Sequence, residues 1–351
     1  MSCELLIRNG NVWDGVKFSK QDILIQNGII IKIQQNIEEK AEKEFQAEGM
    51  IVSSGFIDFH THVKHFSPDS IGIDAKKISF PFGVTHLVDA STHFVTQDDN
   101  IFGLAEVRIA DNKADFSAVE PLLTAHPDKV IGLKVFFDKT FGAVYNTDPL
   151  KEVCKYAKKR NLSVMVHTTN SPVKMYDIVS VLNKGDILSH AFHGGEHNAA
   201  EDSFLCLRYA KEKGVYIDAA LAAYYHIDYS ICRQAIACGI YPDIISSDIT
   251  KDLEFVSDTK YGLTICMSIL ENLGLDRETI MKAVTVRPGS LLSHKQHKGL
   301  LCVGDVTDIA VFKTNYADFT ITDRYDNQVT LNQYLQCVLT IHNGEIVYYE
   351  Q

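Results

Sequence analysis

The middle of the chain alternates short apolar runs with helical stretches, and this alternation constrains the fold more than any other feature. Strands that are apolar throughout and alternate with helices are typical of a parallel sheet covered by helices. The expected strands are residues 55–60, 86–90, 101–105, 131–137, 163–167, 186–190, 215–221 and 243–248, and the clearest helical connectors are residues 149–160, 199–213 and 261–273. Eight strands in about two hundred residues predict a (β/α)8 barrel. The assignment of the third strand is left open, because residues 101–109 could equally begin a helix.

Both ends of the chain contain apolar runs joined by turn signals. Asn-Gly pairs, which favour β-hairpins between such runs, occur at Asn9-Gly10, Asn27-Gly28 and Asn343-Gly344. We therefore predict an α/β protein with two parts. A small β-sandwich domain is built from residues 1–52 and 298–351, and the barrel from residues 53–297. The alternative is two unrelated β appendages.

The composition excludes several classes of partner. Asp and Glu number 45 against 34 Lys and Arg, giving a net charge of -11, and no basic run is present, which argues against nucleic acid. No apolar stretch approaches the ~20 residues that span a bilayer, and the N-terminus lacks the pattern of a signal peptide. The eight cysteines form no C-x-x-C pair. We expect reduced thiols, a cytoplasmic location and no cysteine-based zinc site.

Metal-ligand residue types fall at or near the C-terminal ends of the expected strands. They are His60, His62, Lys134, His167, His190 and Asp248. The C-terminal ends of barrel strands share one face, which holds the active site in enzymes of this fold. We therefore expect these side chains to converge on one metal centre.

The pair His60 and His62 can chelate one ion, because a strand period of two puts both rings on the same side. On its own such a pair could also be two exposed loop histidines. His167 and His190 each end an apolar run, where a hydrogen-bonded core histidine is the commoner outcome, but together on one rim they form a second chelating pair. Asp248 can bind a metal and accept a proton from metal-bound water. Its alternative role is a helix N-cap.

Lys134 lies in an apolar run that should be buried. Burial lowers the pKa of an amine, and a neutral amine reacts with carbon dioxide to form a carbamate that can bridge two cations. The alternative is a lysine paired with an acid across the barrel. Two divalent ions offset by one carbamate, one aspartate and one hydroxide leave a single positive charge to polarise a carbonyl. Zinc is the default ion for a histidine-rich site, with manganese, cobalt and iron as alternatives.

At these positions the chain resembles the amidohydrolase superfamily, in its subtype with two metals and a carbamylated lysine. Gly55-Phe-Ile-Asp-Phe-His-Thr-His looks like the signature of the first strand, and Ser246-Ser-Asp-Ile like that of the last. Residues 72–74, 83–90, 132–135, 165–167 and 188–194 carry a closer likeness to the group labelled deacetylases or dihydroorotase-like proteins.

The resemblance implies which ligands hold which metal ion. The first metal is held by His60, His62 and Asp248, the second by His167 and His190, and carbamylated Lys134 bridges both. A hydroxide between the metals attacks the substrate carbonyl, and Asp248 passes its proton to the leaving group. The implied reaction is hydrolysis of an amide, cyclic amide or acyl ester in a small-molecule substrate. Relatives often form dimers or larger assemblies, so the question whether this chain forms a homo-oligomer is left open.

The likeness to the deacetylases breaks at residues 219–226, where those relatives have a turn rich in glycine and histidine, and at residues 91–100. Both regions should shape the substrate pocket. The predicted substrate-binding residues are Lys64, His193, Tyr224 and His226, with His65, His197 and Tyr225 as further candidates.

Two other functions compete with a two-metal hydrolase. A mononuclear deaminase of heterocycles needs a catalytic Glu near the fifth strand, and no convincing H-x-x-E occurs near the fifth or sixth strand. A barrel that has lost catalysis and serves as a scaffold commonly lacks the ligand histidines, which are all present here.

Overall fold

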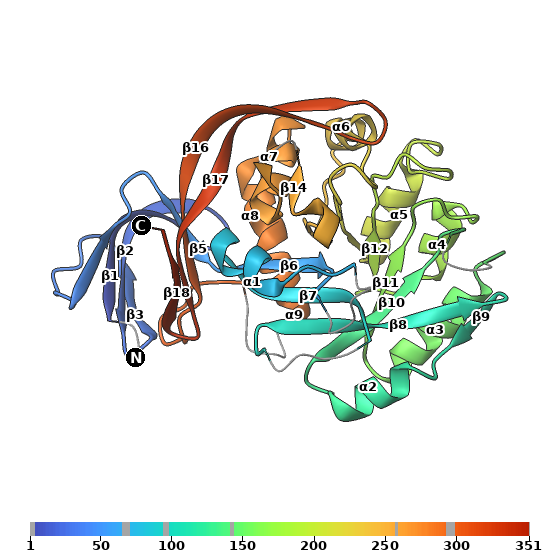
Figure 1. Ribbon diagram of the computed structural model, residues 1–351, viewed down its shortest axis with the longest axis horizontal. Coiled ribbons are helices and arrows are strands. Elements are labelled where there is room, and N and C mark those ends of the chain that lie inside the picture. The colour runs from blue at the N-terminus through green and yellow to red at the C-terminus, as the bar shows by residue number, and fades with distance from the viewer. Residues whose placement is uncertain are drawn as a thin grey trace.

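The computed structural model describes residues 4–64, 71–93, 98–140, 144–256, 259–292 and 299–350. Figure 1 shows a parallel sheet wrapped by helices beside a separate sheet that contains both chain ends. No helix in the described ranges is long and apolar enough to cross a lipid bilayer.

The middle of the chain forms the parallel sheet, in the order β13-β12-β11-β10-β8-β7-β6. Its strands are β6 (Phe56–Thr61), β7 (Val84–Thr92), β8 (Ile101–Ala110), β10 (Val130–Phe136), β11 (Ser163–His167), β12 (Ile187–Ser189) and β13 (Tyr216–Ile217). A short strand, β9 (Lys113–Asp115), pairs antiparallel with the end of β8. Two further short strands, β14 (Phe255–Val256) and β15 (Thr259–Lys260), pair with each other.

Residues 243–249 close this sheet into a barrel. Ile244 bridges Asp218 just beyond β13, and Ile249 bridges Thr61 at the end of β6, both in the parallel sense. The Asp248 N–H also donates to the His60 carbonyl at 2.8 Å. The expected eighth strand is therefore in place, although its pairing is limited to isolated bridges. The predicted barrel with a β-sandwich from both termini is confirmed.

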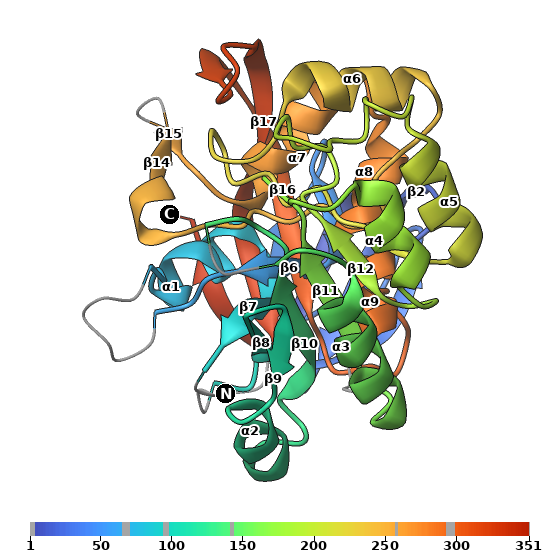
Figure 2. The ribbon, with the colours of Figure 1, turned by 90° about the vertical axis from the view of Figure 1, so that its right-hand side faces the viewer.

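Helices cover the outside of the barrel, as Figure 2 shows for α3, α4 and α5. The helices are α1 (Ala75–Ile78), α2 (Val119–Ala125), α3 (Asp148–Lys159), α4 (Met175–Val181), α5 (Leu205–Lys213), α6 (Tyr229–Ala237), α7 (Leu263–Asn272), α8 (Arg277–Val284) and α9 (Val286–Leu292), with 3-10 turns η1 (Phe80–Phe82) and η2 (Lys251–Leu253). The predicted connectors match α3, α5 and α7. The start of α5 was predicted too early, because the preceding residues form turns that end at Phe204 with φ 64°.

The third predicted strand is a strand and not the start of a helix. β8 continues five residues beyond the predicted end, because an apolar run that is buried on both faces gives way to alternating buried and exposed residues from Glu106 onward. That alternation is the pattern of a half-buried strand.

The two chain ends form the β-sandwich, and its strands are hydrogen-bonded in one continuous sheet, the terminal sheet. Its order is β18-β17-β16-β5-β1-β2-β3, with β4 paired to β1. The strands are β1 (Leu5–Trp13), β2 (Phe18–Gln26), β3 (Ile29–Gln34), β4 (Lys43–Gln46), β5 (Ile51–Ser54), β16 (Ile309–Thr322), β17 (Gln328–His342) and β18 (Glu345–Tyr349). Because β5 pairs directly with β16, the alternative of two unrelated appendages is wrong. The predicted domain boundary at residues 297–298 lies outside the described residues.

Two of the three predicted Asn-Gly turns are present. Asn27-Gly28 and Asn343-Gly344 join paired strands, and all four residues have positive φ, as a two-residue hairpin turn of this kind requires. The turn predicted at Asn9-Gly10 is wrong. β1 runs straight through it with a bulge, because the Asn9 N–H donates to the Asp22 side chain at 2.8 Å instead of ending the strand.

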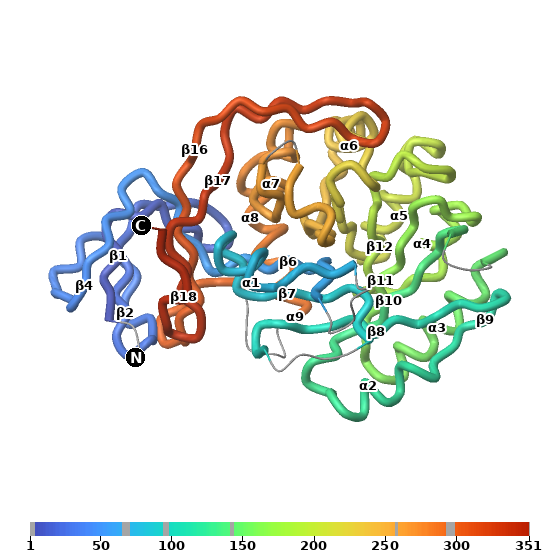
Figure 3. Tube along the Cα trace, in the orientation of Figure 1, coloured from blue at the N-terminus to red at the C-terminus, as the bar shows by residue number. Residues whose placement is uncertain are grey.

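The strands β16 and β17 extend as a long hairpin over α7 and α6, which the red trace in Figure 3 shows most clearly. At its tip, Asp323 accepts a hydrogen bond from the Tyr229 N–H at 2.7 Å. Asn327 donates to Asp228 at 3.2 Å. The terminal sheet therefore reaches the start of α6 on the barrel.

Phe312 on β16 joins the terminal sheet to the barrel core. Its ring stacks on Phe56 of β6, with centroids 4.4 Å apart and an interplanar angle of 10°. A Cβ added at Gly83 would lie 2.3 Å from the Phe312 ring, so only glycine leaves room for this contact. Both phenylalanines are fully buried.

We predict that Phe312→Ala lowers the free energy of unfolding by about 3–5 kcal/mol, since it removes a buried ring and leaves a cavity between the two sheets. The matched control is Tyr316→Ala on the same strand, where the side chain is 77% exposed. Denaturant unfolding followed by circular dichroism measures both changes. A loss at Phe312 no larger than that at Tyr316 would contradict this packing role.

Candidate metal centre

The predicted ligands converge at the C-terminal end of the barrel. His60 is the penultimate residue of β6 and His62 follows this strand. Lys134 lies in β10, His167 ends β11, His190 follows β12 and Asp248 lies in the closing segment. All of them except Lys134 line a cavity of about 940 Å³. The ligand atoms form two compact groups, and in each group they lie within 4.8 Å of one another.

The first group consists of His60, His62 and Asp248. The Oδ1 atom of Asp248 lies 3.2 Å from His60 Nε2 and 3.1 Å from His62 Nε2. On the opposite side of its ring, His60 Nδ1 lies 2.9 Å from Ser189 Oγ and 3.3 Å from Asp218 Oδ2. With an ion bound, a proton held between Nδ1 and the Asp218 carboxylate would leave His60 Nε2 to bind that ion.

The second group contains His167 and His190. The Nδ1 atom of His190 hydrogen-bonds the Ala220 carbonyl at 2.9 Å, which leaves Nε2 to face Asp248 Oδ2 at 3.7 Å. His167 Nε2 lies 3.4 Å from Asp138 Oδ2. His167 offers one ring nitrogen to this group. Asp248 therefore presents one oxygen to each group.

Lys134 is fully buried beside the first group, with Nζ 3.1 Å from His60 Nε2 and 3.4 Å from Met165 Sδ. Burial lowers the pKa of this amine to about 8, although Asp248 and Asp218 oppose the shift. No carboxylate in the described part of the chain forms an ion pair with Nζ. The arrangement does not match the alternative of a lysine paired with an acid across the barrel.

The protonation states of His167, His190 and Asp248 suit metal binding. Burial lowers the pKa of His167 to about 3, against the opposing effect of Asp138. Burial also lowers the pKa of His190 well below its usual value. Burial alone would raise the pKa of Asp248, but His60 and His62 outweigh it and hold that pKa well below its ordinary value. Neutral imidazoles and an ionised carboxylate are the forms that bind a divalent ion.

Several residues at this face have left-handed backbone conformations, which non-glycine residues usually avoid. His190 has φ 55° and Asp248 has φ 47°. Ala220, Ala222 and Ala223, in the segment after β13, have φ between 38° and 48°. Such conformations cost about 1–3 kcal/mol each and cluster at functional sites. Their presence at two predicted ligands is consistent with a site that constrains the chain.

The predicted substrate-binding residues divide into two sets. His226 and Tyr225 line the cavity, and His226 joins His167 and His190 in the second ligand group. Four others are absent from the described lining of the cavity. Lys64 and Tyr224 are exposed, His197 is partly exposed and His193 is buried. His65 lies outside the described residues.

The sequence reasoning missed a charged cluster on the far side of the cavity. Glu106 and Arg108 extend from β8, and His93 Nε2 lies 3.1 Å from Glu106 Oε2. The sequence offered a signal for this cluster, because Glu106 and Arg108 are two positions apart and lie just beyond the predicted end of the third strand at residue 105. Asp218 and Ser189, which contact His60 Nδ1, were also missed, although both lie within expected strands.

Comparison with known proteins adds to this geometry. No family model matches the chain. A deacetylase of Enterococcus faecalis is 27% identical over 99% of both chains. A crystal structure of a dihydroorotase has a TM-score of 0.86 at 21% identity, covering 99% of each chain. A crystal structure of an adenine deaminase has a TM-score of 0.84 at 25% identity, covering 98% of this chain and 99% of that one.

A closed barrel with clustered histidines and an aspartate at the C-terminal ends of its strands defines a class, the metal-dependent barrel hydrolases. Within that class, the full-length likenesses and the motifs of the first and last strands indicate the amidohydrolase superfamily.

We predict that Asp218→Asn weakens binding of the first metal ion by about 10–100-fold, because the neutral amide no longer holds the proton on His60 Nδ1. Competition with a chromophoric chelator measures this affinity. The control is Asp243→Asn, since Asp243 bonds the Ile217 N–H and Lys211 away from the ligands. Equal affinities in the two variants would show that Asp218 does not orient His60.

Proposed function

We propose that this protein is a two-metal hydrolase that cleaves an amide, cyclic amide or acyl ester bond in a small molecule. The observation that carries the proposal is the position of Asp248 between two ligand groups, with the buried amine of Lys134 beside the first of them. A single carboxylate that faces both groups suits a pair of ions better than one ion.

The side chains present fit such a pair of ions. His60, His62 and Asp248 would hold the first ion, and His167 and His190 the second. Neutral imidazoles and one carboxylate are ligands that zinc accepts in open, catalytic sites, so we propose zinc. When bound, the ions would activate a water at neutral pH and polarise the substrate carbonyl.

Lys134 is proposed to carry a carbamate. Its neutral amine forms a bond to the carbon of carbon dioxide and releases one proton, which gives an anionic carboxylate-like group with two oxygens. The burial of Lys134 and its lowered pKa of about 8 favour the neutral amine that this reaction needs. The product would supply the negative charge that two buried divalent ions require.

Asp248 is proposed as the proton carrier. Its carboxylate is ionised, faces the cavity and lies beside both ligand groups. It would accept the proton of the attacking water and deliver it to the leaving nitrogen or oxygen. The histidines on either side hold the pKa of this carboxylate well below its ordinary value, so it is in the ionised form that has a position for a proton.

The cavity is large enough for a compact organic substrate, and its lining combines apolar residues such as Phe136 and Ile109 with Glu106 and Arg108. The name of the Enterococcus faecalis relative makes N-acyl compounds the first candidates. The cysteines in the described ranges are all free, which supports a proposed cytoplasmic location. Assembly into a homo-oligomer stays a prediction.

We expect the purified protein to hold close to two divalent ions per chain and to lose hydrolysis of N-acyl amino acids or cyclic amides after chelation. Elemental analysis and an activity panel test this. A metal-free preparation with full activity would refute the proposal. Release of ammonia from aminated heterocycles, without amide hydrolysis, would instead favour a deaminase.

Lys134→Ala should lower occupancy of the second ion and abolish the effect of bicarbonate on metal uptake, because no carbamate can form. Uptake by metal-free protein, with and without bicarbonate, gives the measurement. Lys129→Ala is the control, since Lys129 bonds backbone oxygens at the start of β10. Unchanged occupancy and an unchanged bicarbonate effect would argue against the bridge.

A further inference from the structure

His226 occupies a position equivalent to that of His190 with respect to Asp248. The Nε2 atoms of both histidines lie 3.7 Å from the same oxygen, Asp248 Oδ2. The rings of His190 and His226 are 4.2 Å apart between centroids, and that of His167 is 5.1 Å from His226. Two ring nitrogens aimed at one carboxylate oxygen point to a shared ligand position.

The three histidines are spaced closely enough to bind one ion. Their ligand atoms lie within 4.8 Å of one another, the same limit that holds for His60, His62 and Asp248. Nitrogen ligands of a tetrahedral zinc ion lie about 3.3 Å apart, given Zn–N bonds of about 2.0–2.1 Å. Small side-chain rotations would therefore close the group around an ion.

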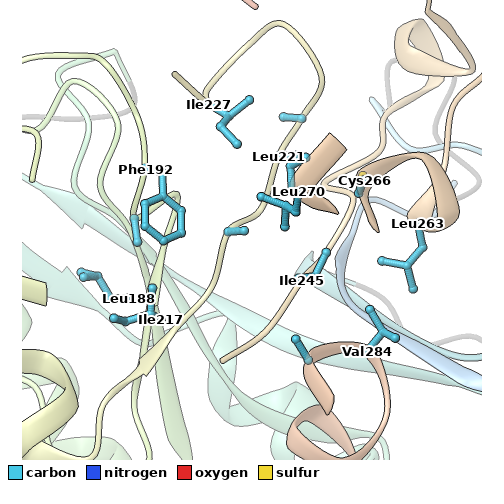
Figure 4. Close-up of a cluster of buried hydrophobic side chains, with 14 of the residues drawn as sticks. Leu188, Phe192, Ile217, Leu221, Ile227, Ile245, Leu263, Cys266, Leu270 and Val284 are labelled. Atoms are coloured by element: carbon cyan, nitrogen blue, oxygen red, sulfur yellow. The ribbon is translucent and has the colours of Figure 1, made fainter. Parts of the chain in front are cut away.

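The segment that carries His226 is anchored on both sides. Figure 4 shows Leu221 and Ile227, both buried, within the hydrophobic cluster that also contains Leu270 of α7. The Ala222 N–H donates to the Ser247 carbonyl, next to Asp248, at 3.0 Å, and the Ala223 N–H donates to the Tyr261 hydroxyl at 2.9 Å.

After His226, the side chain of Asp228 caps α6 by accepting from the Ser230 and Ile231 N–H groups. The tip of the β16–β17 hairpin bonds the same turn through Asp323 and Asn327. His226 is consequently fixed by its backbone. No described group bonds its buried Nδ1 atom, so packing and not a hydrogen bond sets the ring position.

We propose that His226 is a ligand of the second metal ion, which this chain would hold through three imidazoles. The inference rests on the proposed two-metal function and extends it to a residue outside the ligand set implied by the resemblance. His226 lies where the sequence departs from the deacetylase pattern. A third imidazole would keep the second ion bound even where carbamylation of Lys134 is incomplete.

The decisive experiment titrates zinc into metal-free protein against a chromophoric chelator, in the presence of bicarbonate. His226→Gln keeps most of the side-chain volume, and His226→Ala removes it. We expect both to weaken the second binding step by about 10-fold or more and to leave the first step unchanged. His197→Gln is the matched control, because His197 is partly exposed and pairs with Glu201. Visible spectra of cobalt-loaded proteins should change in the His226 variants only.

A zinc-loaded crystal of the unaltered protein gives an answer that needs no variant. It should place His226 Nε2 within about 2.3 Å of the second ion. A longer distance, or a second-step affinity equal to that of His197→Gln, overturns the inference. If affinity is retained while hydrolysis falls, His226 contacts substrate and the proposed function stands. Binding of only one ion by the unaltered protein overturns both.

Discussion

The pairing of residues 243–249 with both edges of the parallel sheet is the contact on which the site depends. It places Asp248 beside His60, and the Asp248 N–H donates to the His60 carbonyl. The Ser247 N–H and hydroxyl donate to the buried Asp58 carboxylate at 3.0 and 2.5 Å, which fixes the closing segment to β6. Without this closure the first and last strands would carry their ligands apart, and no carboxylate would face both histidine groups.

Burial gives the site its chemical character. The low-polarity surroundings disfavour charge on His167, His190 and Lys134, so these groups tend toward the neutral forms that bind cations or react with carbon dioxide. Asp248 keeps its charge because histidines surround it. A buried ionised carboxylate is stable only if neighbouring rings donate to it or cations share the pocket. In the proposed function, bound cations would stabilise it.

The terminal sheet supports the barrel in two places. Phe312 packs into the core beside β6, and the β16–β17 hairpin bonds the turn that begins α6. That turn follows directly after His226. Segments from the end of the chain thus help to hold a loop that faces the metal centre, which gives the terminal sheet a part in shaping the site. This coupling joins regions about one hundred residues apart in sequence.

The sequence by itself determined where the strands lie and which ligands they carry to one face. This was possible because apolar runs mark strands, and the ends of parallel strands meet whatever the loops do. Tertiary structure alone decided that His226 joins His167 and His190 and that β1 runs through Asn9-Gly10. Each depends on a long-range contact, such as the Asp22 side chain that bonds the Asn9 backbone. Local sequence patterns do not encode such contacts.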